Sequence, residues 1–135
     1  AIAFVNNGGD NVPIDYHTVH VHTPDGKHRV TVGTRKDGPQ QIGGAAVVWA
    51  CGTGICVGDR GHAGIRVWTR RGRFVGAIEL WDVFSPLGFS DARPIDAVAH
   101  DGASLVLLAT GRVEGEQASF VPLLVRIDGL AEAAR

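Results

Sequence analysis

Histidine side chains are concentrated near the start of this 135-residue chain, where His17, His20 and His22 fall within six residues. On a β-strand, His20 and His22 would point to the same face, because alternate side chains share a face. Imidazole nitrogens bind Zn²⁺ and Cu²⁺ well. His20 and His22 are therefore weak candidates for a metal site.

The two cysteines, Cys51 and Cys56, are separated by four residues and have no second pair, which is a weak pattern for zinc. If Thr53 and Gly54 form a two-residue turn, the cysteines face each other at a non-hydrogen-bonded position, with Cα atoms ~4.5 Å apart. That spacing suits a disulfide. A turn at Gly52 and Thr53 would shift the register and separate the sulfurs, leaving two buried thiols that act as small apolar residues. A disulfide would indicate an oxidising compartment, and hence an extracytoplasmic or secreted protein.

A local basic cluster surrounds a tryptophan in the middle of the chain, with arginine at positions 66, 70, 71 and 73. Guanidinium groups bind anions, and arginine with tryptophan is a common pairing at interfaces. The candidate binding residues for an anion or an acidic partner are therefore Arg66, Trp68, Arg70 and Arg71. The alternative is a solvated outer hairpin, which the net charge of −1 favours.

Composition excludes several classes of protein. With 13 Lys and Arg against 14 Asp and Glu, the chain lacks the basic character of a nucleic-acid module. No apolar run approaches the ~18 residues of a membrane span. The chain is 44% hydrophobic and 20% charged, so we expect it to fold. Neither a phosphate-binding Walker loop nor a G-x-S-x-G motif is present.

Residue usage favours strands over helices. Glycine accounts for 19 residues, about twice the usual ~7%, while valine and isoleucine together number 25 against 8 leucines. β-Branched side chains lose rotamer freedom in helices and pack well on sheets, and glycine supplies the turns between short strands. The composition predicts an all-β fold.

Two internal periodicities organise these strands. Segment 19–27 aligns with segment 65–73 at an offset of 46, and each reads as alternating apolar residues followed by a Thr-x-x-Gly turn. Segment 48–57 aligns with segment 98–107 at an offset of 50, and each reads as strand, glycine turn and strand. The first offset also matches His20 with Arg66 and His22 with Trp68. The alternative to a metal site is therefore that these positions hold bulky amphipathic groups packed between units.

Each unit would hold two hairpins, and the chain would divide into units of approximately 1–41, 42–92 and 93–135. Four-stranded sheets that recur every 40 to 50 residues are typical of β-propellers, which stack such sheets radially. We therefore expect the whole chain, 1–135, to form three four-stranded antiparallel blades of a propeller, six-bladed when complete.

A family resemblance adds to this pattern. Segment 54–76 resembles an NHL repeat; its sequence is GICVGDRGHAGIRVWTRRGRFVG. In an NHL repeat a strand is followed by "VAD", a short polar loop, "RIQVF", a "DG" turn and "FLG". The chain departs from the pattern at Gly64, where the family usually has arginine, so residue 64 has no side chain to make the contact of that arginine. The resemblance implies a propeller blade, and it is strongest over 42–79.

Some NHL-like propellers are enzymes, and the resemblance implies where their metals would lie. Amidating lyases hold zinc in the central channel through histidines in a Pro-His-Asp setting, but here Ile95 follows Pro94 and cannot bind zinc. Lactonase-like propellers hold calcium through carboxylates, for which Asp59 and Asp96 are the nearest matches. Asp96 is expected to open an inner strand and face the channel mouth, where a lone carboxylate is otherwise simply solvated. Asp59 is also a candidate binding residue, and His62, in the loop after it, is expected to be exposed on the rim as a binding contact or as an ordinary polar residue.

The first functional hypothesis is that the chain is a non-catalytic segment of an NHL-like propeller, which acts as a binding scaffold through loops on a rigid frame. It needs no cofactor. The alternative is part of a metal-dependent, amidating-lyase-like or lactonase-like enzyme, with Zn or Ca in the central channel. Three blades cannot close a ring of ~4 to 8 blades and would expose two blade faces. A protein partner or a second copy is therefore expected to close the propeller, and the isolated chain is not expected to be a monomer.

Overall fold

The computed structural model describes residues 2–6, 15–100, 104–113 and 119–135, and nearly all of its regular structure is β-strand. The strands are β1 (Ile2–Asn6), β2 (Asp15–His22), β3 (His28–Val32), β4 (Ala45–Cys51), β5 (Gly54–Asp59), β6 (Gly64–Trp68), β7 (Phe74–Glu79), β8 (Phe89–His100), β9 (Ser104–Val113) and β10 (Ser119–Asp128). The same described ranges contain three short helices: α1 (Leu80–Phe84), the 3₁₀ helix η1 (Ser85–Leu87) and α2 (Leu130–Ala133). The predicted all-β class is confirmed.

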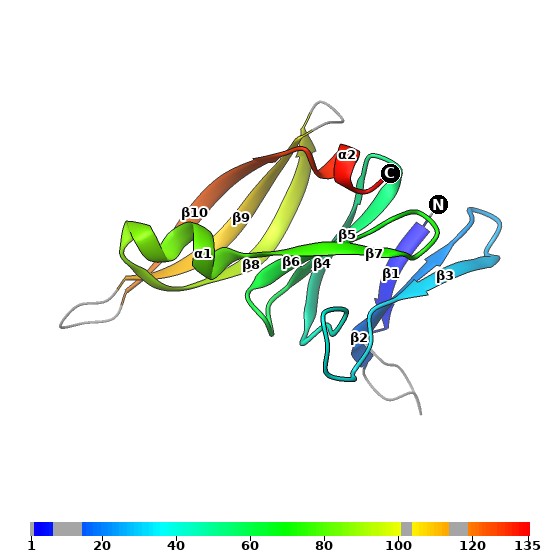
Figure 1. Cartoon of the computed structure of the whole chain (residues 1–135), viewed down its shortest axis with the longest axis horizontal. Helices are drawn as coiled ribbons and strands as arrows, with labels where there is room; N and C mark the ends of the chain where they lie inside the picture. The colour runs from blue at the N-terminus through cyan, green and yellow to red at the C-terminus, as the bar shows by residue number, and fades with distance from the viewer. Residues whose placement is uncertain (1, 7–14, 101–103, 114–118) are drawn as a thin grey trace.

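These strands form three antiparallel sheets that follow one another along the long axis of the molecule (Figure 1). The first sheet has the order β1-β2-β3, the middle sheet β4-β5-β6-β7 and the third sheet β10-β9-β8. Each strand therefore pairs with its neighbours in sequence. Both predicted hairpin pairs are present, and the middle unit has the expected four strands.

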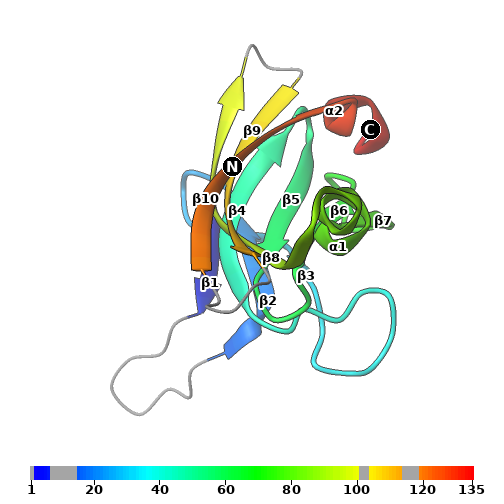
Figure 2. The same ribbon diagram turned by 90° about the vertical axis from the view of Figure 1, so that its left-hand side faces the viewer.

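The outer two units differ from the prediction of four strands each. Within the described residues the first and third sheets have three strands, so the expectation of three four-stranded blades is wrong for both. The boundary at residue 92 is also misplaced, because β8 already begins at Phe89 and residues 80–87 form α1 and η1. After β10, Gly129 adopts a φ of +84° and the alanine-rich end of the chain forms α2, since alanine and glutamate favour helix. Figure 2 shows α1 and α2 on the same side of the molecule.

The hairpins β2-β3 and β6-β7 repeat each other in detail. In the first turn the amide of Thr23 donates to the carbonyl of Lys27 over 2.8 Å, and the amide of Gly26 donates to Thr23 over 2.9 Å. Residues 69, 73 and 72 make the same two bonds at 2.8 and 2.9 Å in the second turn. Gly26 and Gly72 adopt φ of +88° and +87°, a conformation that favours glycine. Both hairpins also carry a register shift one residue before the turn, at the position after Val21 and after Val67.

The two inner strands of the middle sheet, β5 and β6, are buried on both faces. Alternate residues of β5 and β6 point in opposite directions, as the pleat of a strand requires. One core cluster joins the first and middle sheets through Val19, Val21, Val32, Ile42, Ile55, Val57 and Trp68. The other joins the middle and third sheets and includes Cys51, Cys56, Ile65, Val67, Leu105, Leu107 and Ala109. The sheets are thus stacked face to face around two apolar layers.

The predicted disulfide between Cys51 and Cys56 is present, with Cα atoms 5.9 Å apart, but the predicted register is wrong. Cys51 lies opposite Gly54, and Cys56 lies opposite Trp49, so the turn consists of Gly52 and Thr53. Gly52 adopts a φ of +63°, which a glycine at the first loop position of a tight hairpin provides. The two sulfurs meet because the cysteines are diagonal neighbours on one face of the hairpin.

The C-terminal helix packs on this same hairpin. Leu130 and Ala134 are buried in the core between the middle and third sheets. A Cβ atom at Gly54 would collide with the side chain of Ala134 and would lie 2.6 Å from the carbonyl oxygen of Trp68. Gly54 therefore allows α2 to approach the backbone of β5 closely.

Candidate functional site

Asp59, the last residue of β5, is completely buried and collects hydrogen bonds from two loops. Its Oδ1 accepts from the amides of Gly44 and Gly61 over 2.8 and 2.9 Å and from that of His62 over 3.3 Å. Its Oδ2 accepts from the amide of Gly43 over 2.9 Å. The carboxylate thus joins the segment before β4 to the loop between β5 and β6.

Two cationic or potentially cationic side chains complete the environment of Asp59. Arg66 Nη1 lies 3.2 Å from Oδ2, and His62 Nδ1 lies 3.1 Å from the same oxygen. The Arg66 side chain is only 8% exposed, while that of His62 is 34% exposed. An arginine therefore contacts Asp59, but it is residue 66 and not residue 64, which is glycine. A Cβ atom at Gly64 would lie 2.7 Å from the carbonyl oxygen of Ile78, which explains why this position is small.

The two loops held by Asp59 touch through their backbones. A Cβ atom at Gly61 would lie 2.7 Å from the Cα of Gly43 and 2.8 Å from the amide nitrogen of Gly44. Buried carboxylates require such partners, because an unpaired buried charge is very costly. This arrangement has a structural role, because the hydrogen bonds of Asp59 hold the two glycine-rich loops together.

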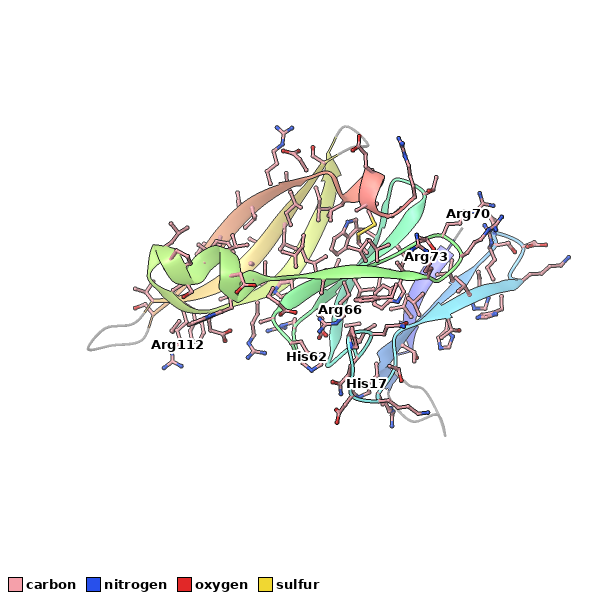
Figure 3. The ribbon with its side chains drawn as sticks, in the orientation of Figure 1. His17, His62, Arg66, Arg70, Arg73 and Arg112 are labelled. Atoms are coloured by element: carbon pink, nitrogen blue, oxygen red, sulfur yellow. A yellow bond between two sulfur atoms is a disulfide. The ribbon has the colours of Figure 1, made fainter. Side chains whose placement is uncertain are left out.

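This geometry changes the expected roles of three predicted binding residues. Asp59 and Trp68 are fully buried and Arg66 is 6% exposed, so none of the three is an exposed binding contact. Trp68 instead fits the alternative that its position holds a bulky group packed between units. Trp68 packs in the core against Phe74, with ring centroids 5.6 Å apart. His62 is half-buried beside Asp59 and is not fully exposed. Figure 3 shows His62 near Arg66, which contacts the same carboxylate.

The metal candidates His20 and His22 lie on the face of the first sheet opposite its valine core. They are joined there by His28, whose ring centroid is 6.3 Å from that of His20 and 5.4 Å from that of His22. His20 Nδ1 lies 3.0 Å from the hydroxyl oxygen of Thr31, and His22 Nδ1 lies 3.1 Å from the carbonyl oxygen of Gly26. Within the described part of the chain, no group of three or more His, Cys, Asp or Glu side chains is placed to hold a metal.

The position of His28 beside His22 could have been predicted from the sequence, because the cross-strand pairing of the two residues follows from the register of the repeated hairpin.

Asp96 does not open an inner strand, because β8 begins seven residues earlier and the backbone of Asp96 pairs with Leu108. The side chain of Asp96 lies outside the described part of the structure.

Arg70 and Arg71 are exposed at the turn between β6 and β7, as predicted, and the fold gathers other arginines around them. A cavity of about 390 Å³ is lined by Thr53, Thr69, Arg70, Arg71, Arg73 and Arg135. Figure 3 shows Arg70 and Arg73 at this end of the hairpin and Arg66 deeper in the molecule. The basic surface therefore includes Arg135, which the linear cluster did not reveal, and excludes Arg66.

Comparison with known proteins gives no match to a family model, to a curated protein or to a solved structure. Among the described residues, none of the helices has the length and apolar character needed to cross a membrane.

Proposed function

We propose that the chain is a segment of an NHL-like β-propeller and acts as a non-catalytic binding scaffold. The observation that carries this proposal is the atomic repetition of the two hairpins at an offset of 46. Equivalent residues make the same turn bonds, share the same bulge and place glycine at the same positive φ. Repeated supersecondary units that bury their faces against neighbours are the basis of propeller architecture.

The direction in which equivalent residues point gives further support. Val19 and Val21 pack toward the middle sheet, and their equivalents Ile65 and Val67 pack toward the third sheet. The offset of 50 behaves in the same way, since Ile55 packs toward the first sheet and Leu105 packs toward the middle one. Each sheet therefore uses the same face to contact the sheet that follows it.

By the same correspondence, the outer face of the third sheet is the surface for the next unit. Ile65 lies opposite Gly58 and is completely buried, whereas Leu124 lies opposite Leu108, which is 50 residues after Gly58, and is 76% exposed. Phe120 lies four residues before Leu124, and hence on the same face of β10, and is 68% exposed. Leu124 is thus an apolar side chain exposed at a position that is buried in the equivalent sheet, and with Phe120 on the same face it favours a protein partner there. We infer that a second copy of the chain covers it.

The disulfide supports a location for this scaffold. Cys51 and Cys56 are bonded, and structural disulfides persist mainly in oxidising compartments. The proposal therefore includes an extracytoplasmic or secreted protein.

Substitution of Leu124 by glutamate tests the assembly. We expect light scattering on the purified chain to give a multiple of 14.2 kDa for the wild type and 14.2 kDa for Leu124→Glu, because a charge on this face prevents apolar packing. Leu87→Glu is the matched control: Leu87 is 69% exposed but lies in η1, so its variant should keep the wild-type mass. Circular dichroism establishes that both variants are folded. A wild type of 14.2 kDa at all concentrations would contradict the proposed assembly.

A further inference from the structure

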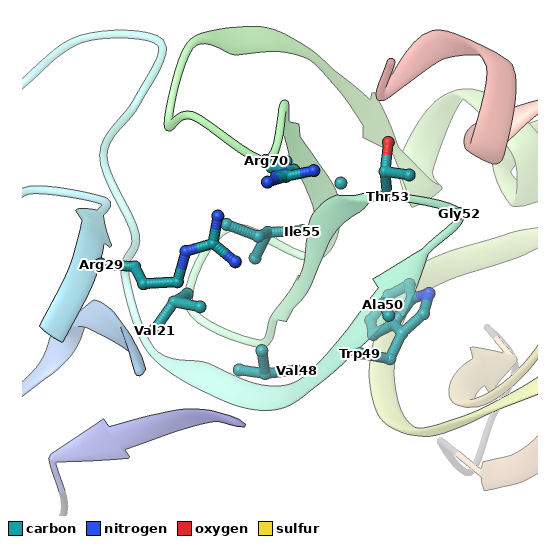
Figure 4. Close-up of a pocket in the computed structure, with 10 residues that line it drawn as sticks. Val21, Arg29, Val48, Trp49, Ala50, Gly52, Thr53, Ile55 and Arg70 are labelled. Atoms are coloured by element: carbon teal, nitrogen blue, oxygen red, sulfur yellow. The ribbon is translucent and has the colours of Figure 1, made fainter. Parts of the chain in front are cut away.

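Five arginines from three segments of the chain, namely β3, the β6-β7 turn and the C-terminal end, converge on two adjoining cavities. The first cavity, of about 390 Å³, opens between the first and middle sheets (Figure 4). Arg29 of β3 reaches it from one side and Arg70 of the β6-β7 turn from another. The second cavity is the one lined by Arg70, Arg71, Arg73 and Arg135. Arg70 and Thr53 line both cavities, so the two form a continuous basic surface.

Arginine supplies the charged side chains of this surface. Neither cavity is lined by an aspartate or glutamate of the described chain. Ion pairs between described residues are seen at cations outside the two cavities, among them Lys27, His62, Arg66, Arg93 and Arg126. Because the chain as a whole has a net charge of −1, the basic surface is a local feature of the fold and not a general excess of positive charge.

The walls of the cavities also differ from those of an ordinary solvated hairpin. Val21, Val48 and Ile55 provide an apolar floor to the first cavity, while Thr53 places a side-chain hydroxyl group where the two cavities meet. An apolar floor lowers the local dielectric constant, which strengthens the attraction of the guanidinium groups for an anion. Planar guanidinium groups bind phosphate and sulfate oxygens through paired hydrogen bonds.

We propose that these cavities form a binding site for a small ligand that carries two or more phosphate- or sulfate-type groups. One group binds between Arg29 and Arg70, and another binds among Arg70, Arg71, Arg73 and Arg135. This site is separate from the outer face of the third sheet, so it does not depend on the proposed assembly.

Calorimetric titration with inorganic tripolyphosphate and, separately, with a sulfated disaccharide tests the site and distinguishes a phosphate from a sulfate ligand. We expect saturable binding of at least one probe by the wild type, and about tenfold weaker binding or worse for Arg70→Gln, which removes the guanidinium shared by both cavities. Arg112→Gln is the matched control, because Arg112 is an exposed arginine of β9 at the far end of the molecule (Figure 3). It should change the affinity by less than about twofold.

Other outcomes have defined meanings. Arg71→Gln should also weaken binding, so the test does not depend on one variant being folded. Leu124→Glu should leave the affinity unchanged, which separates this site from the assembly surface. The proposal is overturned if neither probe binds at millimolar concentration, or if Arg112→Gln weakens binding as much as Arg70→Gln does.

Discussion

Replacement of Asp59 by alanine is expected to lower the free energy of unfolding by about 3–5 kcal/mol, because it leaves a buried charge without its partner. The lost carboxylate accepts four backbone hydrogen bonds and lies 3.2 Å from the guanidinium of Arg66, which is 6% exposed. The four amides would lose their acceptor and Arg66 would keep an uncompensated charge. Urea denaturation followed by tryptophan fluorescence measures the loss.

Two further variants make this test specific. Asp82→Ala removes an exposed carboxylate from α1 and should change stability by no more than about 0.5 kcal/mol. The double variant Asp59→Ala with Arg66→Met should recover part of the loss, because the buried charge is removed together with its partner. The role assigned to Asp59 is wrong if its alanine variant is as stable as Asp82→Ala.

Replacement of Gly61 by alanine is expected to lower the free energy of unfolding by about 2–3 kcal/mol. The added Cβ would lie 2.7 Å from the Cα of Gly43 and 2.8 Å from the amide nitrogen of Gly44. These are backbone atoms, which cannot rotate away as a flexible side chain can. The two loops would have to separate, and the bonds from Gly43 and Gly44 to Asp59 would lengthen.

Gly76→Ala is the control for this substitution. Gly76 lies in β7, and a Cβ atom there would have no other atom within 4 Å. Alanine at this position should change stability by less than about 1 kcal/mol in either direction. Equal stabilities of the two variants in urea denaturation would show that the close contact between the loops does not exist.

The repeated hairpins could be predicted from the sequence because their determinants are local. A Thr-x-x-Gly turn between alternating apolar residues fixes its own hydrogen bonds, so an offset of 46 in sequence became the same turn in structure. The third unit could not be predicted in this way, since Ser119–Asp128 forms one strand of ten residues and the chain then turns into a helix. The number of strands in the third unit therefore depends on where β10 ends and the helix begins.

The disulfide illustrates a limit of reasoning from local sequence. Cys51 and Cys56 were predicted as a bonded pair on condition that Thr53 and Gly54 form the turn. The turn is instead formed by Gly52 and Thr53, because Gly52 adopts the positive φ, and the cysteines meet diagonally across the strands. Both glycines flank Thr53, so composition alone could not decide between the two registers.

The candidate site required tertiary information. The sequence predicts Asp59 as a binding residue, but segment 43–44, far from it in sequence, covers its carboxylate with two amides. The basic cluster was expected to include Arg66, whose side chain turns inward to Asp59, and could not include Arg29 or Arg135, which other segments bring to it. Long-range packing therefore decides which charges are buried and which face solvent.

The most direct test of the proposed stacking is carbene footprinting of wild-type protein, with labelling of Leu124 compared with that of Leu87. Both are leucines and their exposed fractions in the single chain are similar, 76% and 69%. If a further sheet covers the outer face of the third sheet, Leu124 should be labelled several-fold less than Leu87, and the difference should disappear on dilution to the monomer. Equal labelling of the two leucines at high protein concentration would contradict the account.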